Sequence, residues 1–186
     1  MTPILVSGPG AEPLTLPEAN AWLRLDTDEE DAIVLSLVTA ARMMIEREAR
    51  RLLMTQSWQI TTDCWPENGI LTLPIGPVAS ISAIRVSDST GVATLLPTET
   101  YRLEAARDPA LIILTGAPPR PGQSIGGIEI DLICGFGDEA SDVPEPLRHA
   151  IRLLVARWFE HRGDAGAGSL PADVGRLISP FRRRRL

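Results

Sequence analysis

The spacing of apolar residues changes twice along this chain of 186 residues, and these changes constrain the fold more than any other feature. Between residues 56 and 137 apolar and polar residues alternate, as around Trp58 and Ile60 and again along residues 128–136. This period of two is typical of strands with one buried face. On both sides of the region apolar residues recur every three or four positions, as in amphipathic helices. The pattern predicts an α+β protein.

The N-terminal region, residues 14–54, predicts two helices. Thr15 and Glu18 have the spacing of a capping box, with Pro17 in the first turn of a short helix. The acidic segment 27–30, TDEE, predicts the capped start of a second, longer helix. Apolar residues of that helix form two adjacent rows, with Ile33, Leu37, Ala40 or Ala41, and Met44 in one and Val34, Val38, Ala41 and Ile45 in the other. Because the two rows make a wide stripe, we expect the helix to pack against the protein body, a neighbouring copy or both.

The middle region, residues 56–137, predicts about six short strands in an antiparallel β-sandwich or barrel inserted between the helices. Segments 80–87 and 92–96 flank the turn sequence DSTG, and segments 101–104 and 111–114 flank a turn with Pro109. Both arrangements are typical of hairpins. Prolines mark the expected strand ends, at positions 74, 77, 97, 118, 119 and 121.

The C-terminal region begins with a predicted long helix at residues 141–163, which completes the helical framework. A cap is expected at residues 142–145, and Gly163 is placed to end the helix. Residues 164–169 are small and predict a flexible linker. The apolar residues that follow have no element of their own to pack on, and four arginines come after them. Residues 164–186 are therefore expected to be an extended tail that orders on binding a partner.

The charge of the chain is unevenly distributed. The formal net charge is −6, and the 18 basic residues are all arginine, four of them consecutive at 182–185. The rest of the chain is therefore strongly acidic and should repel nucleic acid, which confines phosphate affinity to the arginine cluster. Without lysine, the chain cannot supply a Walker lysine or a Schiff-base amine.

Residue patterns that carry catalysis or bind metal are weak. His149 and His161 are twelve residues apart on one predicted helix, about 18 Å along its axis, too far to share a metal ion. Gly135 and Gly137 are not accompanied by the third glycine of a dinucleotide-binding motif. The acidic residues at 28–31 do not have the spacing of a calcium-binding loop. The Gly-x-Ser-x-Gly motif of serine hydrolases is absent from the sequence. We therefore predict no catalytic residue, no metal site, no cofactor and no enzymatic activity.

The compartment follows from cysteine use and hydropathy. Cys64 and Cys134 are the two cysteines, and the N-terminus has no signal-peptide pattern. No apolar run reaches the roughly 18 residues that a membrane span needs. We expect a protein made in a reducing bacterial cytoplasm, with both cysteines as small buried apolar residues and no membrane association.

The order of several short segments resembles a known family. The opening LTLPEANAWLRLD at 14–26, the acidic start at 28–31 and IERE at 45–48 resemble the head-to-tail connector (adaptor) proteins of long-tailed phages and phage-derived gene transfer agents. The segment TQSW at 55–58 and the strand-rich middle are similar to the subgroup with a β-rich insertion. Near the C-terminus, LPADV at 170–174 and LISPFR at 177–182 are similar to the end of that family.

The resemblance implies a structural virion protein at the head-tail joint of a phage or phage-like particle. Such a protein forms a ring of identical subunits, twelve to match the portal, beneath the portal vertex. The ring joins capsid to tail and continues the DNA channel, so that DNA passes without sequence-specific binding. One side of the ring contacts the portal protein, and the other receives a stopper or tail-completion protein.

The resemblance also assigns roles to residues. The C-terminal segment is expected to dock on the portal through Leu170, Val174, Leu177, Ile178, Phe181, Arg182, Arg183, Arg184 and Arg185. A ring of one protein needs two different patches on each copy, and Ile33, Leu37 and Met44 are candidates for part of that subunit interface. Two other classes stay open: a nucleic-acid-binding or regulatory module that uses the arginine cluster, and an enzyme with a substrate site in the β region.

Overall fold

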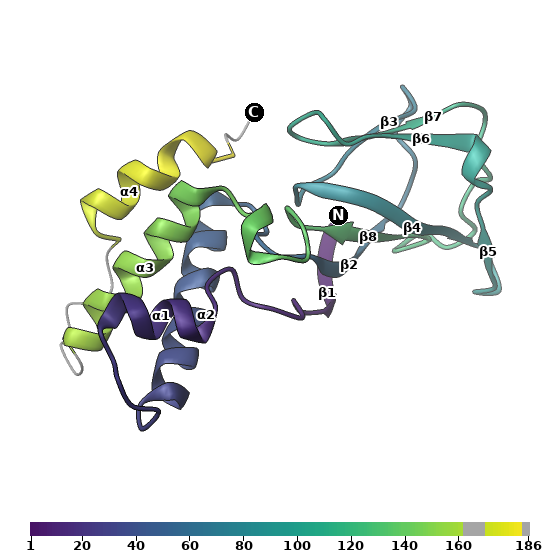
Figure 1. Ribbon diagram of the computed structural model, residues 1–186. Helices are drawn as coiled ribbons and strands as arrows, with labels where there is room; N and C mark the ends of the chain where they lie inside the picture. The colour runs from purple at the N-terminus through teal and green to yellow at the C-terminus, as the bar shows by residue number, and fades with distance from the viewer. Residues whose placement is uncertain (162–169, 184–186) are drawn as a thin grey trace. The chain divides into compact units, whose positions relative to one another are not determined.

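The chain forms two compact units in a computed structural model that describes residues 1–161 and 170–183 (Figure 1). The β unit comprises Met1–Pro9 and Thr55–Phe136, and the helical unit comprises Gly10–Met54 and Gly137–Leu186. The described residues contain four α-helices and two antiparallel sheets. This composition confirms the predicted α+β class.

A five-stranded antiparallel sheet forms the larger layer of the β unit. Its strand order is β1 (Thr2–Ser7), β2 (Gln56–Thr62), β8 (Ile128–Cys134), β4 (Val78–Ser87) and β5 (Ala93–Leu95). In the register, Ile60 pairs with Ile130, and both are fully buried. Gln59 pairs with Asp131 on the outer face, where the two side chains are hydrogen-bonded at 3.1 Å. The predicted alternation of inward apolar and outward polar residues is thus present in this sheet.

A three-stranded sheet forms the second layer of the β unit (Figure 1). Its order is β3 (Ile70–Thr72), β7 (Leu111–Leu114) and β6 (Tyr101–Glu104), and a 3₁₀ turn at Thr98–Thr100 precedes β6. Leu71 and Ile112 are buried and contribute to the core between the layers. The pairing of β4 with β5 and of β6 with β7 confirms both predicted hairpins.

The turn between β4 and β5 is closed by Asp88. Its side chain accepts hydrogen bonds from the hydroxyl and backbone N–H of Thr90 and from the N–H of Val92. These bonds, of which that from the Thr90 side chain has the largest effect, lower the pKa of Asp88 from its ordinary value. The turn residues thus define the hairpin locally, as their sequence predicts.

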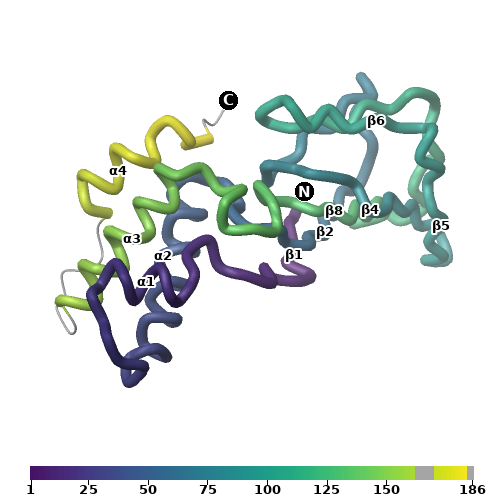
Figure 2. Tube along the Cα trace, in the orientation of Figure 1, coloured from purple at the N-terminus to yellow at the C-terminus, as the bar shows by residue number. Residues whose placement is uncertain are grey.

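The described residues of the helical unit form four helices: α1 (Leu16–Leu23), α2 (Asp31–Ala49), α3 (Glu145–Glu160) and α4 (Ala172–Ile178). Two 3₁₀ turns, Ala140–Asp142 and Ser179–Phe181, flank α3 and α4. The trace in Figure 2 shows α3 between α2 and α4. The buried residues of α3 are Leu147, Ala150, Ile151, Leu154 and Val155.

One of the predicted helix caps is confirmed. Thr15 and Glu18 form the capping box of α1. The prediction for α2 is wrong, because its N-cap is Glu30, which makes no side-chain cap hydrogen bond. The prediction for α3 is also wrong, because Asp142 accepts the N–H of Glu139 in the preceding 3₁₀ turn, and α3 begins at Glu145 without a side-chain cap. Gly163, the expected end of α3, lies outside the described residues.

Two arginines attach the segment before α1 to the long helices. The guanidinium of Arg42, almost fully buried on α2, pairs with Glu12 at 2.7 Å and Glu46 at 2.8 Å. Burial lowers the pKa of Arg42, but the hydrogen bond and charge of Glu12 and the charge of Glu46 raise it overall, so the group stays ionised. On α3, Arg148 donates to the carbonyl of Pro13 at 3.0 Å and pairs with Glu18 at 2.6 Å.

The cysteines differ in their surroundings. Cys134 is fully buried on β8, and burial raises the pKa of its thiol to about 12. Cys64 is exposed in the segment after β2, so the expectation that both cysteines are buried is wrong for Cys64. The short sequence between β2 and β3 contains Pro66 and the turn residues Asn68 and Gly69, and the thiol lies outside the sheet.

The expectation of an extended C-terminal tail is wrong for residues 170–183. They form α4 and the following 3₁₀ turn, and Val174 and Ile178 are fully buried within the helical unit. Spaced four residues apart, these two side chains lie on one face of α4 and pack toward α3. The predicted linker at 164–169 and the arginines at 184 and 185 lie outside the described residues.

Three polar contacts hold the end of this segment on α2 and the residues that follow it. The Nε of Arg51 donates to the carbonyl of Phe181 at 2.6 Å, and the N–H of Arg183 donates to the carbonyl of Ala49 at 3.0 Å. Arg182 pairs with Glu48 at 3.2 Å. The C-terminal segment therefore belongs to the core of its own helical unit.

Because Ile178 is fully buried, Ile178→Ala should lower the free energy of unfolding by about 2–5 kcal/mol through the cavity it leaves. Urea denaturation followed by circular dichroism measures this change. The matched control is Arg176→Ala, two residues earlier on the exposed side of α4, with an expected change of about 0.5 kcal/mol or less. Equal, small effects of both substitutions would contradict the packing of α4.

Candidate assembly surfaces

Helix α2 carries apolar residues on two faces. Val34, Val38, Ala41 and Ile45 are fully buried in the helical unit. In the other predicted row, Ile33 is 42% exposed, and Leu37 and Met44 are half-buried. One row is therefore part of the core, while the row proposed for a subunit interface reaches the surface.

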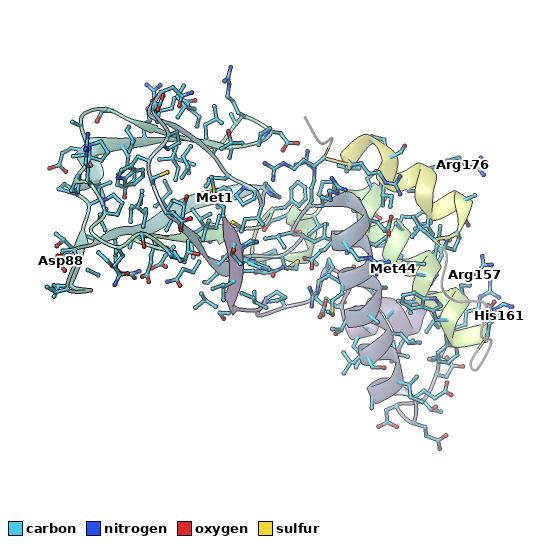
Figure 3. The ribbon with its side chains drawn as sticks, turned by 180° about the vertical axis from the view of Figure 1, so that it is seen from behind. Met1, Met44, Asp88, Arg157, His161 and Arg176 are labelled. Carbon is cyan, nitrogen blue, oxygen red and sulfur yellow. The ribbon has the colours of Figure 1, made fainter. Side chains whose placement is uncertain are left out.

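We call this surface the α2 outer face and define it by Ile33, Ser36, Leu37, Ala40, Met43 and Met44. At about 100° per residue, these positions follow one another along the helix within roughly a third of its circumference. Met43 is 60% exposed and Ala40 is also exposed. Figure 3 shows the helical unit from the side of α2 and labels Met44. The face offers mostly methyl and thioether groups, with one hydroxyl at Ser36.

Residues of the C-terminal segment lie on two sides of α4. Val174 and Ile178 face the core, whereas Leu170, Leu177, Phe181 and Arg183 are half-buried and Arg182 is exposed. Of the nine residues predicted to dock on a partner, Arg184 and Arg185 fall beyond the described part of the chain. The solvent side of the segment also carries Arg176, whose side chain points away from α4 in Figure 3.

The β unit exposes apolar residues at both ends of its five-stranded sheet. All six residues of β1 are exposed, including Ile4, Leu5 and Val6. At the other end, Val92 and Leu95 are exposed. The apolar residues of β1 run consecutively instead of alternating, so the sequence pattern does not predict this strand.

The histidines make structural contacts. The ring of His149 meets Trp22 edge to face with centroids 5.7 Å apart, and Nδ1 of His161 lies 3.0 Å from the carbonyl oxygen of Arg157. Within residues 1–161 and 170–183, no three His, Cys, Asp or Glu side chains are grouped so that they could hold a metal ion. No helix in the same part of the chain is long and apolar enough to cross a membrane.

Comparison with solved structures relates the chain to one kind of particle. It is similar to a chain in the neck of an empty gene transfer agent (GTA) particle computed with C6 symmetry, with 34% identity and a TM-score of 0.84. A chain in the virion of a native GTA particle is 31% identical with a TM-score of 0.85. A chain in the neck of a native GTA particle computed with C12 symmetry is 33% identical with a TM-score of 0.77.

Each alignment covers 100% of this chain and 97% of the matched chain. No protein-family model matches, and neither does any curated protein. The identity and full coverage show that the chain belongs to the family of gene transfer agent neck proteins. It is thus a structural protein of a phage-like particle, as the family resemblance implied.

Proposed function

We propose that this chain is the adaptor of the neck, a non-enzymatic protein that forms a ring beneath the portal and joins capsid to tail. The main support is the full-length match to neck chains in particles computed with sixfold and twelvefold symmetry. Twelve copies surround the DNA channel in this proposal, and DNA passes without sequence-specific binding. The protein is made in the bacterial cytoplasm and built into the virion at the head-tail joint.

The α2 outer face supplies one part of the contact between neighbouring copies. A ring built from one protein joins one patch of each copy to a different patch of the next. Ile33, Leu37 and Met44 suit this use, because each keeps apolar surface in contact with solvent in the isolated chain. Burying such a side chain contributes up to about 1.5–3 kcal/mol, and the contact is repeated at every subunit.

Charges on this face should prevent ring formation and leave the subunit folded. We predict that Ile33→Glu with Met43→Glu shifts the protein from rings to single subunits in native mass spectrometry, with an unchanged circular dichroism spectrum. The physical reason is that two carboxylates would lose their water in the contact without a partner.

Leu35→Glu is the matched control for this experiment. Leu35 is 44% exposed on the same helix but lies about 160° around it from Ile33. The control should still form rings. Rings in the double variant would remove the α2 outer face from the interface. Loss of rings in the control alone would move the contact to a different face of α2.

The C-terminal segment supplies the contact with the portal in this proposal. Its candidate docking residues are Leu170, Leu177, Phe181, Arg182, Arg183, Arg184 and Arg185. Because Val174 and Ile178 are buried in the helical unit, the segment docks as a folded element, and these two residues hold it in place. Leu177 and Phe181 then contact the portal with their exposed parts, while the guanidinium of Arg182 meets portal carboxylates.

Repetition strengthens such a contact. Each docked segment raises the effective concentration of the next segment around the ring, so twelve weak attachments give a firm joint. The opposite side of the ring receives the stopper or tail-completion protein. Exposed acids at 26, 28 and 29, between α1 and α2, keep part of the helical unit negative, which suits a channel through which DNA moves without sticking.

Reversing charge on the solvent side of the segment tests the portal contact. We predict that Arg176→Glu with Arg182→Glu weakens attachment to portal-bearing heads at least tenfold, because the new carboxylates repel portal acids. Attachment is measured by co-sedimentation of the purified protein with heads. The variant keeps Val174 and Ile178, so it avoids the loss of core packing that deletion of residues 170–186 would cause. Because Arg182→Glu also breaks the pair with Glu48, an unchanged urea-denaturation midpoint is required to show that the segment stays packed.

Arg157→Glu is the matched control, since Arg157 is exposed at the end of α3 and points into solvent (Figure 3). It should attach like the unaltered protein. Normal attachment of the double variant would contradict portal docking through this segment. Loss of DNA from heads that still attach would instead place the arginines against DNA in the channel.

A further inference from the structure

The two edges of the five-stranded sheet are apolar and different from each other. The strand order places β1 and β5 at opposite edges, four strand spacings or about 19 Å apart, and Figure 2 shows them at opposite ends of the β unit. Val6 is 64% exposed on the first edge, and Leu95 is 62% exposed on the second. Because the two edges are so far apart, they cannot pack against each other within one subunit.

The polar groups between these edges are satisfied within the sheet. The cross-strand pairs place Ile4, Gln59 and Asp131 in one row of the outer face, and Leu95 beside Arg85 in the next row. Arg85 forms ion pairs with Asp131 and Glu129. The centre of the outer face is therefore a network of internal contacts, and the apolar surface lies at its two ends.

Neither edge is well suited to adding a further strand. Pro3 has no N–H to donate, and β1 has a register shift between Leu5 and Ser7. At the other edge, β5 has three residues. A partner at either edge is therefore held mainly by contacts between apolar side chains, which favours a packed side-by-side contact over a continuous sheet.

We propose that the β1 edge of one copy packs against the β5 edge of the next copy, as a second contact in the ring. This inference rests on the proposed ring and adds the β unit to it. A second copy of the chain is the partner that fits these edges. A head-to-tail contact needs two different patches on each subunit, and the β1 and β5 edges of one sheet are two such patches. Related chains come from gene transfer agent necks computed with C6 and C12 symmetry.

Disulfide cross-linking between the two edges tests the contact. Val6→Cys and Leu95→Cys are combined in a Cys64→Ser background, where the remaining Cys134 is fully buried. Mild oxidation of assembled rings should give a ladder of covalent multimers longer than dimers on a non-reducing gel. Either cysteine alone should give monomers. The matched control pairs Leu95→Cys with Glu67→Cys, which is exposed in the turn before β3, and should also give monomers.

Native mass spectrometry of the same samples reports ring formation separately from cross-linking. Intact rings without a ladder would overturn the edge contact and leave the proposed ring in place. Dimers formed by Val6→Cys alone would show a symmetric contact between two β1 edges and would also overturn the edge contact. The absence of rings from the unaltered protein would overturn the proposed function and this contact together.

Discussion

The structure of the helical unit depends on a helix that is apolar on two faces. The inner face of α2, with Val34, Val38 and Ile45, is fully buried in the unit's core. The short α1, the longer α3 and the seven-residue α4 contribute to that core, and Ile33 and Met43 remain exposed. The hydrophobic effect on this second face favours a contact with another molecule. Folding therefore uses one face of this helix, and the proposed contact between subunits uses the neighbouring face.

The C-terminal segment has its own place in this core. Val174 and Ile178 are buried in the helical unit, while Arg51 and Ala49 bind the backbone of the residues that follow α4. The exposed arginines of the segment, Arg176 and Arg182, are therefore held on a folded element and not on a disordered chain. A preordered element loses less conformational entropy on binding than a disordered one, which supports the proposed docking of this segment.

The sequence predicted features that depend on local spacing. Thr15 and Glu18 define the start of α1, and Asp88 with its neighbours defines a hairpin, because the groups that interact lie within a few residues. Strand β1 was missed because its partner β2 begins about fifty residues later and its apolar run has no alternation. The packing of α4 was missed for a similar reason: two apolar side chains reveal a helical face, but the surface that buries them is formed by α3. The candidate interface on α2 could be predicted from the second row of apolar residues in the sequence. Met43, the most exposed large residue of this face, was not among the predicted interface residues.

Methionine oxidation tests the two-faced character of α2 most directly. Brief hydroxyl-radical labelling followed by mass spectrometry compares Met43 and Met44 in free subunits and in intact particles, with the fully buried Met54 as an internal reference. We expect rapid oxidation of Met43 in the free subunit and at least tenfold protection in the particle, with little oxidation of Met54 in either. Equal oxidation of Met43 in both states would show that the outer face stays in solvent, and would contradict its role in assembly.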